Sequence, residues 1–399
     1  MTIKNKSSKL KLINFIKTLD LTKTNEVYIS NGIIIPKEEI NQNHFTVIDC
    51  KDCIIAPGFI DPQINGLDEC NFWEFPSFEK INELRLKLAL SGTVAFCPTI
   101  ITEEKDKIIK SIDHINSYLK QSNDDFGSKI LGIHLEGIFI TKFGVHEKKY
   151  VQEELTVENL KPLIKENVVM FTLAPELDKT GEAIGFLQKN NILVSIGHSN
   201  ATYKEGKSAI KKFGLQCVTH MFNSLRGVEG FLHRSNDSVH LKVLELKLTD
   251  ENSIDPDQDG IILSILKEKN VCCMVIADGL HVNKEVIEFL YQIKGKELFS
   301  LVTDMVSTNF FNSAQSHGNL GGGQTSLEKC ILNLVKWDIC NIEDALICAS
   351  RPISNQLRIA KESGLGQLNF GKKANIAIWD TKKNSVKGTI IGENIFLNY

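Results

Sequence analysis

The chain has 399 residues, of which 42% are hydrophobic and 24% charged, and its formal net charge is −3. This composition is ordinary for a globular protein and excludes a mainly disordered chain. The small negative charge gives no reason to expect a nucleic-acid or anionic-membrane partner, so any anion that the protein binds must be held by local groups.

The sequence also carries no pattern of a membrane or secreted protein. No apolar run approaches the ~18 residues of a membrane helix, and the first residues lack an apolar segment followed by a cleavage site. We therefore expect no membrane partner, and we interpret the ten cysteines as reduced thiols of a cytoplasmic protein. Cys50 and Cys53 form a lone C-x-x-C pair, which favours two strand thiols over a metal or redox motif.

Eight short and mainly apolar segments recur along the chain, and segments of helical period lie between them. The predicted strands are residues 54–60, 93–100, 130–136, 168–174, 192–198, 216–220, 271–277 and 299–304. The predicted helices include residues 78–90, 105–119, 157–165, 180–189, 202–213 and 284–293. Strands that alternate with helices in this way predict a (β/α)8 TIM-like barrel, which places catalytic groups at the C-terminal ends of its strands.

The two ends of the chain fall outside this alternation. Residues 9–16 alternate in polarity like a strand, and we take them as the first strand of the chain. Residues from about 366 onward are also strand-like, with turns between the strands. We predict that residues 1–56 and 366–399 form one small β-sandwich domain beside a catalytic barrel of residues 57–365.

Polar side chains suited to metal binding or proton transfer stand at several predicted strand ends. Glu136 ends the third strand, His198 the fifth, His220 the sixth and Asp304 the eighth. Alone, His198 or His220 is explained as a core histidine, and Asp304 as a helix cap. Together, two imidazoles and a carboxylate form a familiar site for one divalent metal ion and a water, whose proton Asp304 could accept. His134 is either a further ligand or a packing neighbour, and packing is favoured.

The motifs around these residues resemble those of the N-acetylglucosamine-6-phosphate deacetylases of the amidohydrolase superfamily. The matching stretches are APGFIDPQING at 56–66, HLEG at 134–137, GHSNA at 197–201, THMFN at 219–223 and TD at 303–304, with further matches at 96–99, 172–177 and 276–279. They keep their order over about residues 54–380. Most amidohydrolases have His-x-His in the first strand, where this chain has Gln63-Ile64-Asn65, and since amides are poor ligands beside imidazoles, a single metal ion is expected.

The resemblance implies a metal-dependent hydrolase with specific site residues. These are the metal ligands Glu136, His198 and His220, the catalytic residues Asp304 and His146, and the substrate-binding residues Asn223, Arg234, His281 and Gln63. In this scheme Asp304 is the general base and then the general acid, and His146 helps to polarise the acetyl carbonyl. The cofactor is one divalent metal ion, zinc or iron. The family's phosphate-binding arginine comes from a neighbouring subunit, which implies a homodimer.

The implied reaction converts N-acetyl-D-glucosamine 6-phosphate into D-glucosamine 6-phosphate and acetate, in amino sugar catabolism. Two alternatives stay open. One is a deacetylase of another N-acetyl sugar phosphate, such as the galactosamine epimer. The other is an inactive sugar-phosphate-binding regulator, because the stretch between Asp304 and Gly321 is shorter than in the family. Arg226 is an alternative to Arg234 as the phosphate partner, since both follow Asn223.

Overall fold

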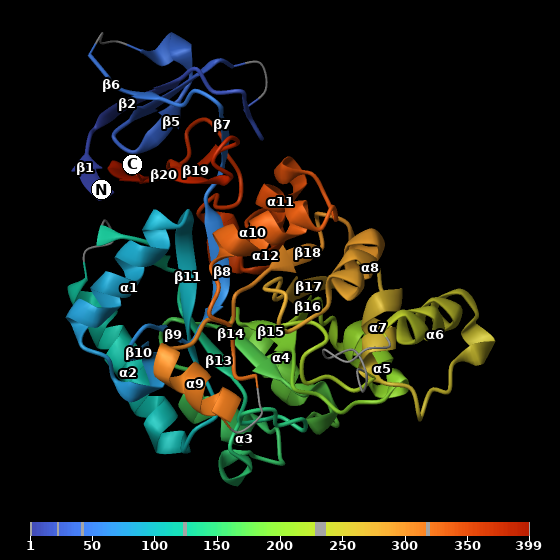
Figure 1. The fold of residues 1–399 in the computed structure, drawn as a ribbon. Helices are drawn as coiled ribbons and strands as arrows, with labels where there is room; N and C mark the ends of the chain where they lie inside the picture. Colours follow the sequence, from blue (N-terminus) through green and yellow to red (C-terminus); the bar gives the residue numbers. More distant parts are fainter. Residues whose placement is uncertain are drawn as a thin grey trace.

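The computed structural model describes residues 2–21, 24–40, 44–122, 126–227, 237–316 and 320–398, without the side chains of residues 2–5 and 237–240. A barrel with surrounding helices forms the larger part of the molecule, and a smaller β-domain contains both ends of the chain (Figure 1). The two ends of the chain therefore meet in one domain, as the sequence predicts.

Eight parallel strands form the barrel. They are β8 (Phe59–Ile64), β11 (Thr93–Ile100), β13 (Ile133–Glu136), β14 (Val168–Leu173), β15 (Leu193–Ile196), β16 (Cys217–Val218), β17 (Cys272–Val275) and β18 (Phe299–Leu301), and the short β12 (Lys129–Ile130) pairs with β11 ahead of β13. From β11 to β18 the strands pair in chain order, and β8 pairs with β11. A parallel bridge between Ile64 and Met305 brings the last segment back to β8. The barrel is therefore nearly closed, which confirms the predicted fold class.

Helices cover the outside of the barrel and explain why its strands are apolar on both faces. The helices are α1 (Phe78–Leu90), α2 (Lys105–Gln121), α3 (Val157–Leu160), α4 (Glu182–Lys189), α5 (Tyr203–Phe213), α6 (Asp237–Thr249), α7 (Ile261–Lys267), α8 (Lys284–Lys294), α9 (Thr308–Ser316), α10 (Leu327–Lys336), α11 (Ile342–Cys348), α12 (Arg351–Gln356) and α13 (Arg358–Glu362). α1 has the predicted bounds, and α5 begins at a capping box of Thr202 and Glu205 and ends at Gly214 with a positive φ. Within the ranges described above, no helix has the length and apolarity needed to cross a membrane.

Two facing sheets form the smaller domain. One sheet has the order β1 (Thr2–Lys6), β21 (Asn394–Asn398), β20 (Ser385–Ile391), β19 (Asn375–Asp380), β7 (Cys53–Pro57) and β3 (Lys17–Thr18), and the other has β5 (Ile33–Ile35), β4 (Glu26–Ser30), β2 (Lys9–Ile13) and β6 (Thr46–Asp49). Leu10 and Ile29 of one sheet share a buried cluster with Ile376 and Ile390 of the other. The two sheets therefore pack as a sandwich, while the exact boundaries at residues 56 and 365 stay predictions.

Three predicted strands differ from those in the structure by more than small changes at their ends, and the one predicted at 130–136 is divided into β12 and β13. The strand predicted at 54–60 is divided, because β7 pairs with β19 in the sandwich and β8 enters the barrel. The chain changes sheet at Gly58, where an added Cβ would lie 2.1 Å from a methyl carbon of Val94. At the N-terminus, β1 precedes the strand predicted to be first, and that strand ends at Ile13 rather than Ile16. The apolar run is continuous across Gly58, so periodicity alone does not reveal the change of sheet.

Candidate active site

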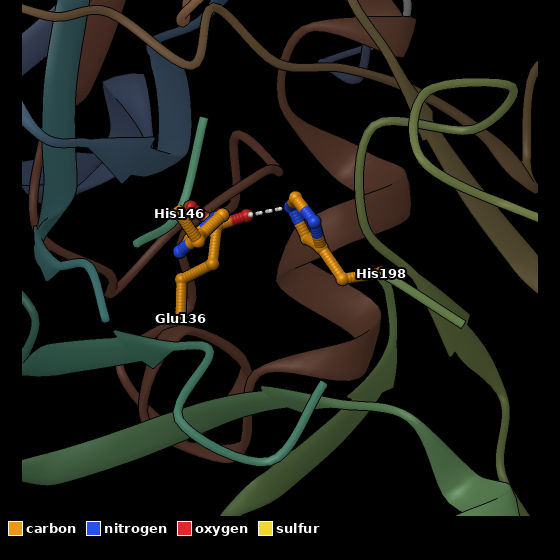
Figure 2. Close-up of side chains that lie close together, drawn as sticks. All are labelled: Glu136, His146 and His198. Atoms are coloured by element: carbon orange, nitrogen blue, oxygen red, sulfur yellow. Dashed lines mark ion pairs between the residues drawn. The ribbon is translucent and has the colours of Figure 1, made fainter. Parts of the chain in front are cut away.

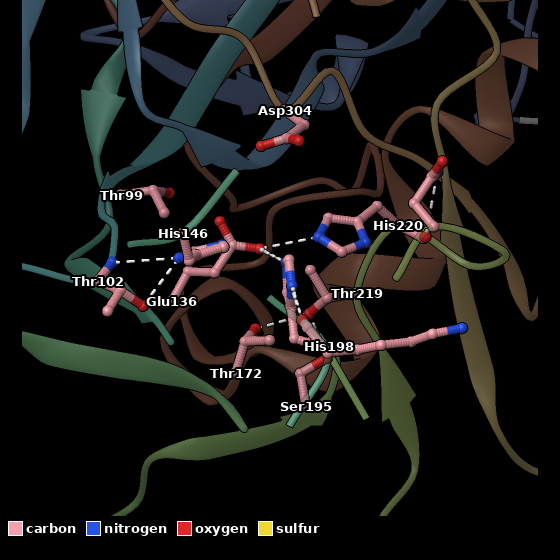
Figure 3. Close-up of polar contacts among 12 residues, drawn as sticks. Thr99, Thr102, Glu136, His146, Thr172, Ser195, His198, Thr219, His220 and Asp304 are labelled. Carbon is pink, nitrogen blue, oxygen red and sulfur yellow. Dashed lines mark hydrogen bonds and ion pairs between the residues drawn. The ribbon is translucent and has the colours of Figure 1, made fainter. Parts of the chain in front are cut away.

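Four of the predicted site residues meet at the C-terminal end of the barrel (Figure 3). Glu136 is the last residue of β13, whereas His198, His220 and Asp304 follow the ends of β15, β16 and β18. Oε1 of Glu136 lies 2.8 Å from Nε2 of His220 and 3.5 Å from Nε2 of His198. Because parallel strands end at one edge of the barrel, side chains that are far apart in the sequence come into direct contact.

The backbone at three of these positions has an uncommon conformation. His198 has φ of 49°, His220 of 28° and Asp304 of 50°, which is the left-handed region for residues that are not glycine. Such conformations cost ~1 to 3 kcal/mol each and persist only where the surrounding structure imposes them. The barrel edge therefore holds these side chains in positions that an isolated chain would not favour.

Burial and mutual charge govern proton binding in this cluster. Burial raises the pKa of Glu136, but the hydrogen bonds and charges of His198 and His220 outweigh it and hold the pKa well below its ordinary value. Burial lowers the pKa of His220, yet Glu136 raises it to about 9. For Asp304, burial and the nearby charge of Glu136 raise the pKa to about 7 against the opposing influence of His220 and His281. Asp304 is thus a carboxyl group that both accepts and releases a proton near neutral pH.

The orientation of His198 is set by the loop that follows Glu136. Nδ1 of His198 donates to the carbonyl oxygen of Lys142 at 2.8 Å. In return, the backbone amides of Thr141 and Lys142 both donate to the carbonyl oxygen of His198 at 2.9 Å. Because Nδ1 is bound to a carbonyl oxygen, Nε2 is the nitrogen of His198 that faces Glu136 and that a metal ion could reach.

The carboxylate of Glu176 stabilises the contact between His198 and the loop of Thr141 and Lys142. Its Oε1 accepts from the Thr141 hydroxyl and from the Asn200 amide at 2.8 Å, and its Oε2 accepts from the Ser199 hydroxyl at 2.7 Å. One carboxylate therefore ties the loop that holds His198 to the two residues that follow His198. These contacts hold the loop against His198 without involving the nitrogens of its ring.

His146 lies beside the cluster but belongs to the same loop as Lys142. Among the described residues, Glu136, His146 and His198 form a group whose potential ligand atoms all lie within 4.8 Å of one another (Figure 2). The rings of His146 and His198 make an edge contact with centroids 4.3 Å apart. Burial and the neighbouring His198 lower the pKa of His146 to about 3, so the ring is neutral. By proximity, either His146 or His220 could complete a set with Glu136 and His198.

Several buried polar atoms at this end of the barrel have no hydrogen-bond partner in the part of the chain that the structure describes. These open polar atoms are Oε1 and Nε2 of Gln63, Oδ1 of Asn65, Nδ1 of His220 and Nε2 of His281. Buried polar atoms in proteins are nearly always paired, so such a concentration indicates a place for a ligand. A carboxylate with imidazole nitrogens is a donor set that suits zinc or iron. The residues present thus fit one divalent cation and a polar substrate.

The structure describes some of the predicted substrate-binding residues near the site, but not all of them. Gln63 is buried near the end of β8, and Nδ1 of His281 lies 2.8 Å from Asp278. Asn223 follows His220, and its side chain donates to the His220 carbonyl oxygen at 3.3 Å. Arg234 lies outside the described residues. The alternative residue Arg226 donates to the carbonyl oxygen of Gln258 at 2.9 Å, in the loop before α7.

A fully paired polar network, which we call the polar belt, lies one layer deeper in the barrel. It consists of His134, Thr172, Ser195 and Thr219. Nδ1 of His134 donates to the carbonyl oxygen of Pro62 at 3.0 Å, so its Nε2 accepts from Thr172 at 2.7 Å. The hydroxyls of Thr172 and Thr219 lie 2.7 Å apart, as do those of Thr219 and Ser195. Both ring nitrogens of His134 are thus occupied by hydrogen bonds inside the barrel. His134 is therefore a packing neighbour, the role favoured from the sequence.

Three further polar residues contact the site and were not singled out by their residue type. Thr102 contacts His146, Glu176 holds the loop around His198, and Nδ2 of Asn65 donates to Asp304 at 2.6 Å. A search of strand ends for metal-ligating side chains passes over them, because threonine and asparagine are common in turns. Their positions just after β11, β14 and β8 are the signal that would have found them.

Curated relatives align with nearly the whole chain. N-acetylglucosamine-6-phosphate deacetylase of Caenorhabditis elegans is 29% identical over 426 residues, which covers 97% of this chain and 95% of the relative. The protein of the same name from Mus musculus is 28% identical over 407 residues and covers 93% and 91%. No family model matches the sequence. The resemblance predicted from the motifs is therefore confirmed by relatives that match well beyond those motifs.

Solved structures give the same answer for the fold. The N-acetylglucosamine-6-phosphate deacetylase from Pasteurella multocida has a TM-score of 0.79 at 23% identity and covers 98% of this chain and 100% of its own. A variant of the Mycobacterium smegmatis deacetylase, solved with N-acetyl-D-glucosamine-6-phosphate, has a TM-score of 0.74 at 18% identity, with 97% and 99% covered. An enamidase described as a member of the amidohydrolase superfamily has a TM-score of 0.58 at 13% identity, with 97% and 95% covered.

Proposed function

We propose that this protein hydrolyses the acetamide bond of N-acetyl-D-glucosamine 6-phosphate and releases D-glucosamine 6-phosphate and acetate, the activity that the names of its near full-length relatives state. The observation that carries the proposal is the meeting of Glu136, His198 and His220 with Asp304 at one end of the barrel. A carboxylate and two imidazoles suit a cation, and a carboxyl that titrates near neutral pH suits proton transfer.

In this proposal Glu136, His198 and His220 hold one divalent cation, zinc or iron. When bound, that cation supplies Lewis acidity, which polarises a carbonyl and lowers the pKa of water. Asp304 accepts a proton from the attacking water and returns it to the amide nitrogen, so that the amine leaves uncharged. The Asn65 amide, which donates to Asp304 at 2.6 Å, keeps the carboxyl aimed while it exchanges that proton.

The remaining residues bind and orient the substrate. His146 donates a hydrogen bond to the acetyl oxygen, where negative charge develops, and such a donor contributes about 3 to 4 kcal/mol. Gln63 and His281 offer open polar atoms to sugar hydroxyls or phosphate. Asn223 and Arg234 are the proposed phosphate partners, with Arg234 contributed by the second subunit of a homodimer. Arg226 is a weaker candidate, because its guanidinium already donates to backbone carbonyls.

The cytosol is the proposed compartment. All ten cysteines have free thiols, and nine of them are buried. Burial raises the pKa of Cys50 to about 12, and for Cys53 to about 11, so both thiols stay protonated and unreactive at neutral pH. Free thiols throughout a chain of this size are typical of a reducing compartment.

The two alternatives are less well supported. The short stretch after Asp304, which motivated an inactive regulator, is occupied by α9, whose Phe310 packs edge-on against Trp73 at 5.3 Å. α9 is also tied to the hairpin after β8, because the Thr308 amide donates to the Asp68 carbonyl oxygen at 2.8 Å. Residues 308–316 of this shorter segment therefore still pack against the hairpin that follows β8. The galactosamine epimer differs at one hydroxyl, and no residue described here distinguishes the two sugars.

The proposal is tested by following amine release from N-acetyl-D-glucosamine 6-phosphate and from its galactosamine epimer, with and without a chelator. We expect turnover of the glucosamine substrate that the chelator abolishes and that zinc or iron restores. A Glu136→Gln variant should lose both activity and bound metal, with the fold checked by circular dichroism. Activity that survives chelation or the substitution would overturn the metal assignment, and binding without turnover by the metal-loaded protein would establish the regulator instead.

A further inference from the structure

His146 and His198 are neighbouring imidazoles with different hydrogen-bond environments. Nδ1 of His198 faces a carbonyl oxygen, which can only accept, so that nitrogen carries a proton and Nε2 is the nitrogen left to face Glu136. Nδ1 of His146 instead faces Thr102, whose hydroxyl oxygen lies at 2.8 Å and whose backbone nitrogen lies at 3.4 Å (Figure 3). Nδ1 of His198 therefore faces a hydrogen-bond acceptor, whereas Nδ1 of His146 faces a backbone donor and a hydroxyl.

The partners of Thr102 decide which nitrogen of His146 carries the proton. A backbone N–H can only donate, so the Thr102 amide is compatible only with an Nδ1 that accepts. The Thr102 hydroxyl oxygen already accepts from the backbone amide of Ile138 at 2.8 Å, which leaves its own proton available for donation. The amide of Thr102 therefore donates to Nδ1, and the hydroxyl can donate to the same ring nitrogen. In a neutral imidazole, the proton must then be on Nε2.

The backbone beside this contact leaves no room for a rearranged partner. Gly137 has φ of 99°, and a Cβ at this position would lie 2.0 Å from the Thr102 hydroxyl oxygen and 3.1 Å from Nδ1 of His146. Thr102 and His146 are both buried, with 4% and 6% of their surfaces exposed, so water does not compete for the hydrogen bonds between them. The glycine allows the hydroxyl and the ring to meet, and the tight packing keeps them together.

We infer that Thr102 is a positioning residue that locks His146 in the Nε2–H tautomer, so that His146 is a hydrogen-bond donor to the reacting acetyl oxygen and not a metal ligand. The inference rests on the proposed function, which supplies the acetyl group. A nitrogen that carries a proton has no lone pair for a metal ion. His220 is therefore the second imidazole ligand, although His146 lies within 4.8 Å of Glu136 and His198.

The tautomer is measured directly by nitrogen-15 NMR of the full chain labelled at histidine, with zinc bound. The signal of His146 is identified by its disappearance in a His146→Gln variant. We expect Nε2 of His146 to have the shift of a protonated nitrogen and Nδ1 that of an unprotonated one. A protonated Nδ1, or an Nε2 shifted by metal coordination, would overturn the inference. This readout does not depend on turnover.

Three threonine variants then test the role of Thr102. Thr102→Val removes the hydroxyl donor and should convert part of His146 to the Nδ1–H form, whereas Thr102→Ser should keep the wild-type signal. Thr99→Val is the matched control, because Thr99 lies three residues earlier, within β11, and is also buried but contacts His134 and the Cys97 carbonyl oxygen instead. It should leave the His146 signal unchanged. An unchanged signal in Thr102→Val would show that the backbone amide suffices and that the Thr102 side chain does not position His146, which would overturn the inference.

Kinetics and metal content complete the test. In Thr102→Val we expect kcat to fall at least tenfold and no more than the ~1,000-fold cost of losing one oxyanion donor, with KM unchanged and with rescue by Thr102→Ser. His146→Gln should retain one metal ion per chain, whereas His220→Gln should lose it. Loss of the metal ion in His146→Gln and its retention in His220→Gln would contradict the inference. A chain with the expected tautomer but no turnover refutes only the proposed function, and an active chain with the other tautomer refutes only this inference.

Discussion

Two buried polar regions of the barrel interior, in neighbouring layers of side chains, differ in how completely their hydrogen bonds are made. In the polar belt, His134, Thr172, Thr219 and Ser195 bond in a continuous series at distances of 2.7 Å. At the mouth above it, the open polar atoms are as deeply buried but are left without partners among the residues that the structure describes. The chain satisfies one region by itself and leaves the other for a ligand.

This difference separates structural polarity from functional polarity. A buried polar atom without a partner costs about 1 to 3 kcal/mol, so a folded chain keeps such atoms only where something compensates for them. In the belt the partners come from adjacent strands, and polarity there stabilises the barrel. At the mouth the cost remains until a cation or substrate binds, as is usual for sites in which activity and stability compete. Burial and residue type alone would have classed the two regions together.

The largest effect that the comparison predicts concerns Asp304. In Asp304→Asn the amide keeps an oxygen for Asn65 but cannot accept a proton, so kcat should fall by about 100- to 10,000-fold. The free energy of unfolding at pH 8 should not fall, because burial and Glu136 already disfavour the negative charge of Asp304. Steady-state kinetics and urea titration check the two parts. A variant that keeps its activity would remove Asp304 from the mechanism, and one that unfolds more easily would place Asp304 with the structural residues.

A substitution in the belt should have the opposite profile. Thr172→Val removes the hydroxyl that joins His134 to Thr219 and leaves buried groups unpaired, so the free energy of unfolding should fall by about 1 to 3 kcal/mol. Its kcat should fall far less than that of Asp304→Asn. Thr172→Ser, which keeps the hydroxyl, is the control and should recover most of the stability. A Thr172→Val protein with wild-type stability would mean that the belt is not a stabilising element.

The smallest expected effect, taken per pH unit, is a change in the pH dependence of stability. Burial raises the pKa of Asp61 to about 7, against opposing hydrogen bonds from the Thr303 hydroxyl and the Thr303 and Gln63 amides. The folded chain therefore keeps a proton that the unfolded chain has already released, and this contribution to stability is present below pH ~4 and is lost as pH rises to about 7. Between pH 6 and 7 the loss is at most ~1.4 kcal/mol.

Asp61→Asn removes this titration and keeps an oxygen for the Thr303 hydroxyl. Urea titrations at a series of pH values should therefore show a shallower decline between pH 5 and 7 in Asp61→Asn than in the natural chain. Because all other groups are shared, the difference between the two slopes belongs to Asp61. Equal slopes would show that Asp61 is ionised at these pH values in the folded protein as well, and would class it with the satisfied groups of the belt.

The sequence by itself determined the barrel and the residues at its strand ends. Alternating apolar strands and helices predict the (β/α)8 architecture, and α1 begins and ends where its periodicity indicates. Glu136, His198, His220 and Asp304 could be selected because a parallel barrel brings strand ends together whatever their separation in the chain. These are local patterns, and local burial and residue type are what periodicity reports.

Only the tertiary structure decided which groups are paired and where the proton of each imidazole is held. Asn65 meets Asp304, and Thr102 meets His146, across segments that no local pattern connects. The change of sheet at Gly58 likewise depends on β19, which lies near the other end of the chain. A hydrogen bond between remote segments forms only if the distance between donor and acceptor is correct to within a few tenths of an ångström. Residue type states which atoms can donate or accept, whereas packing alone selects their partners.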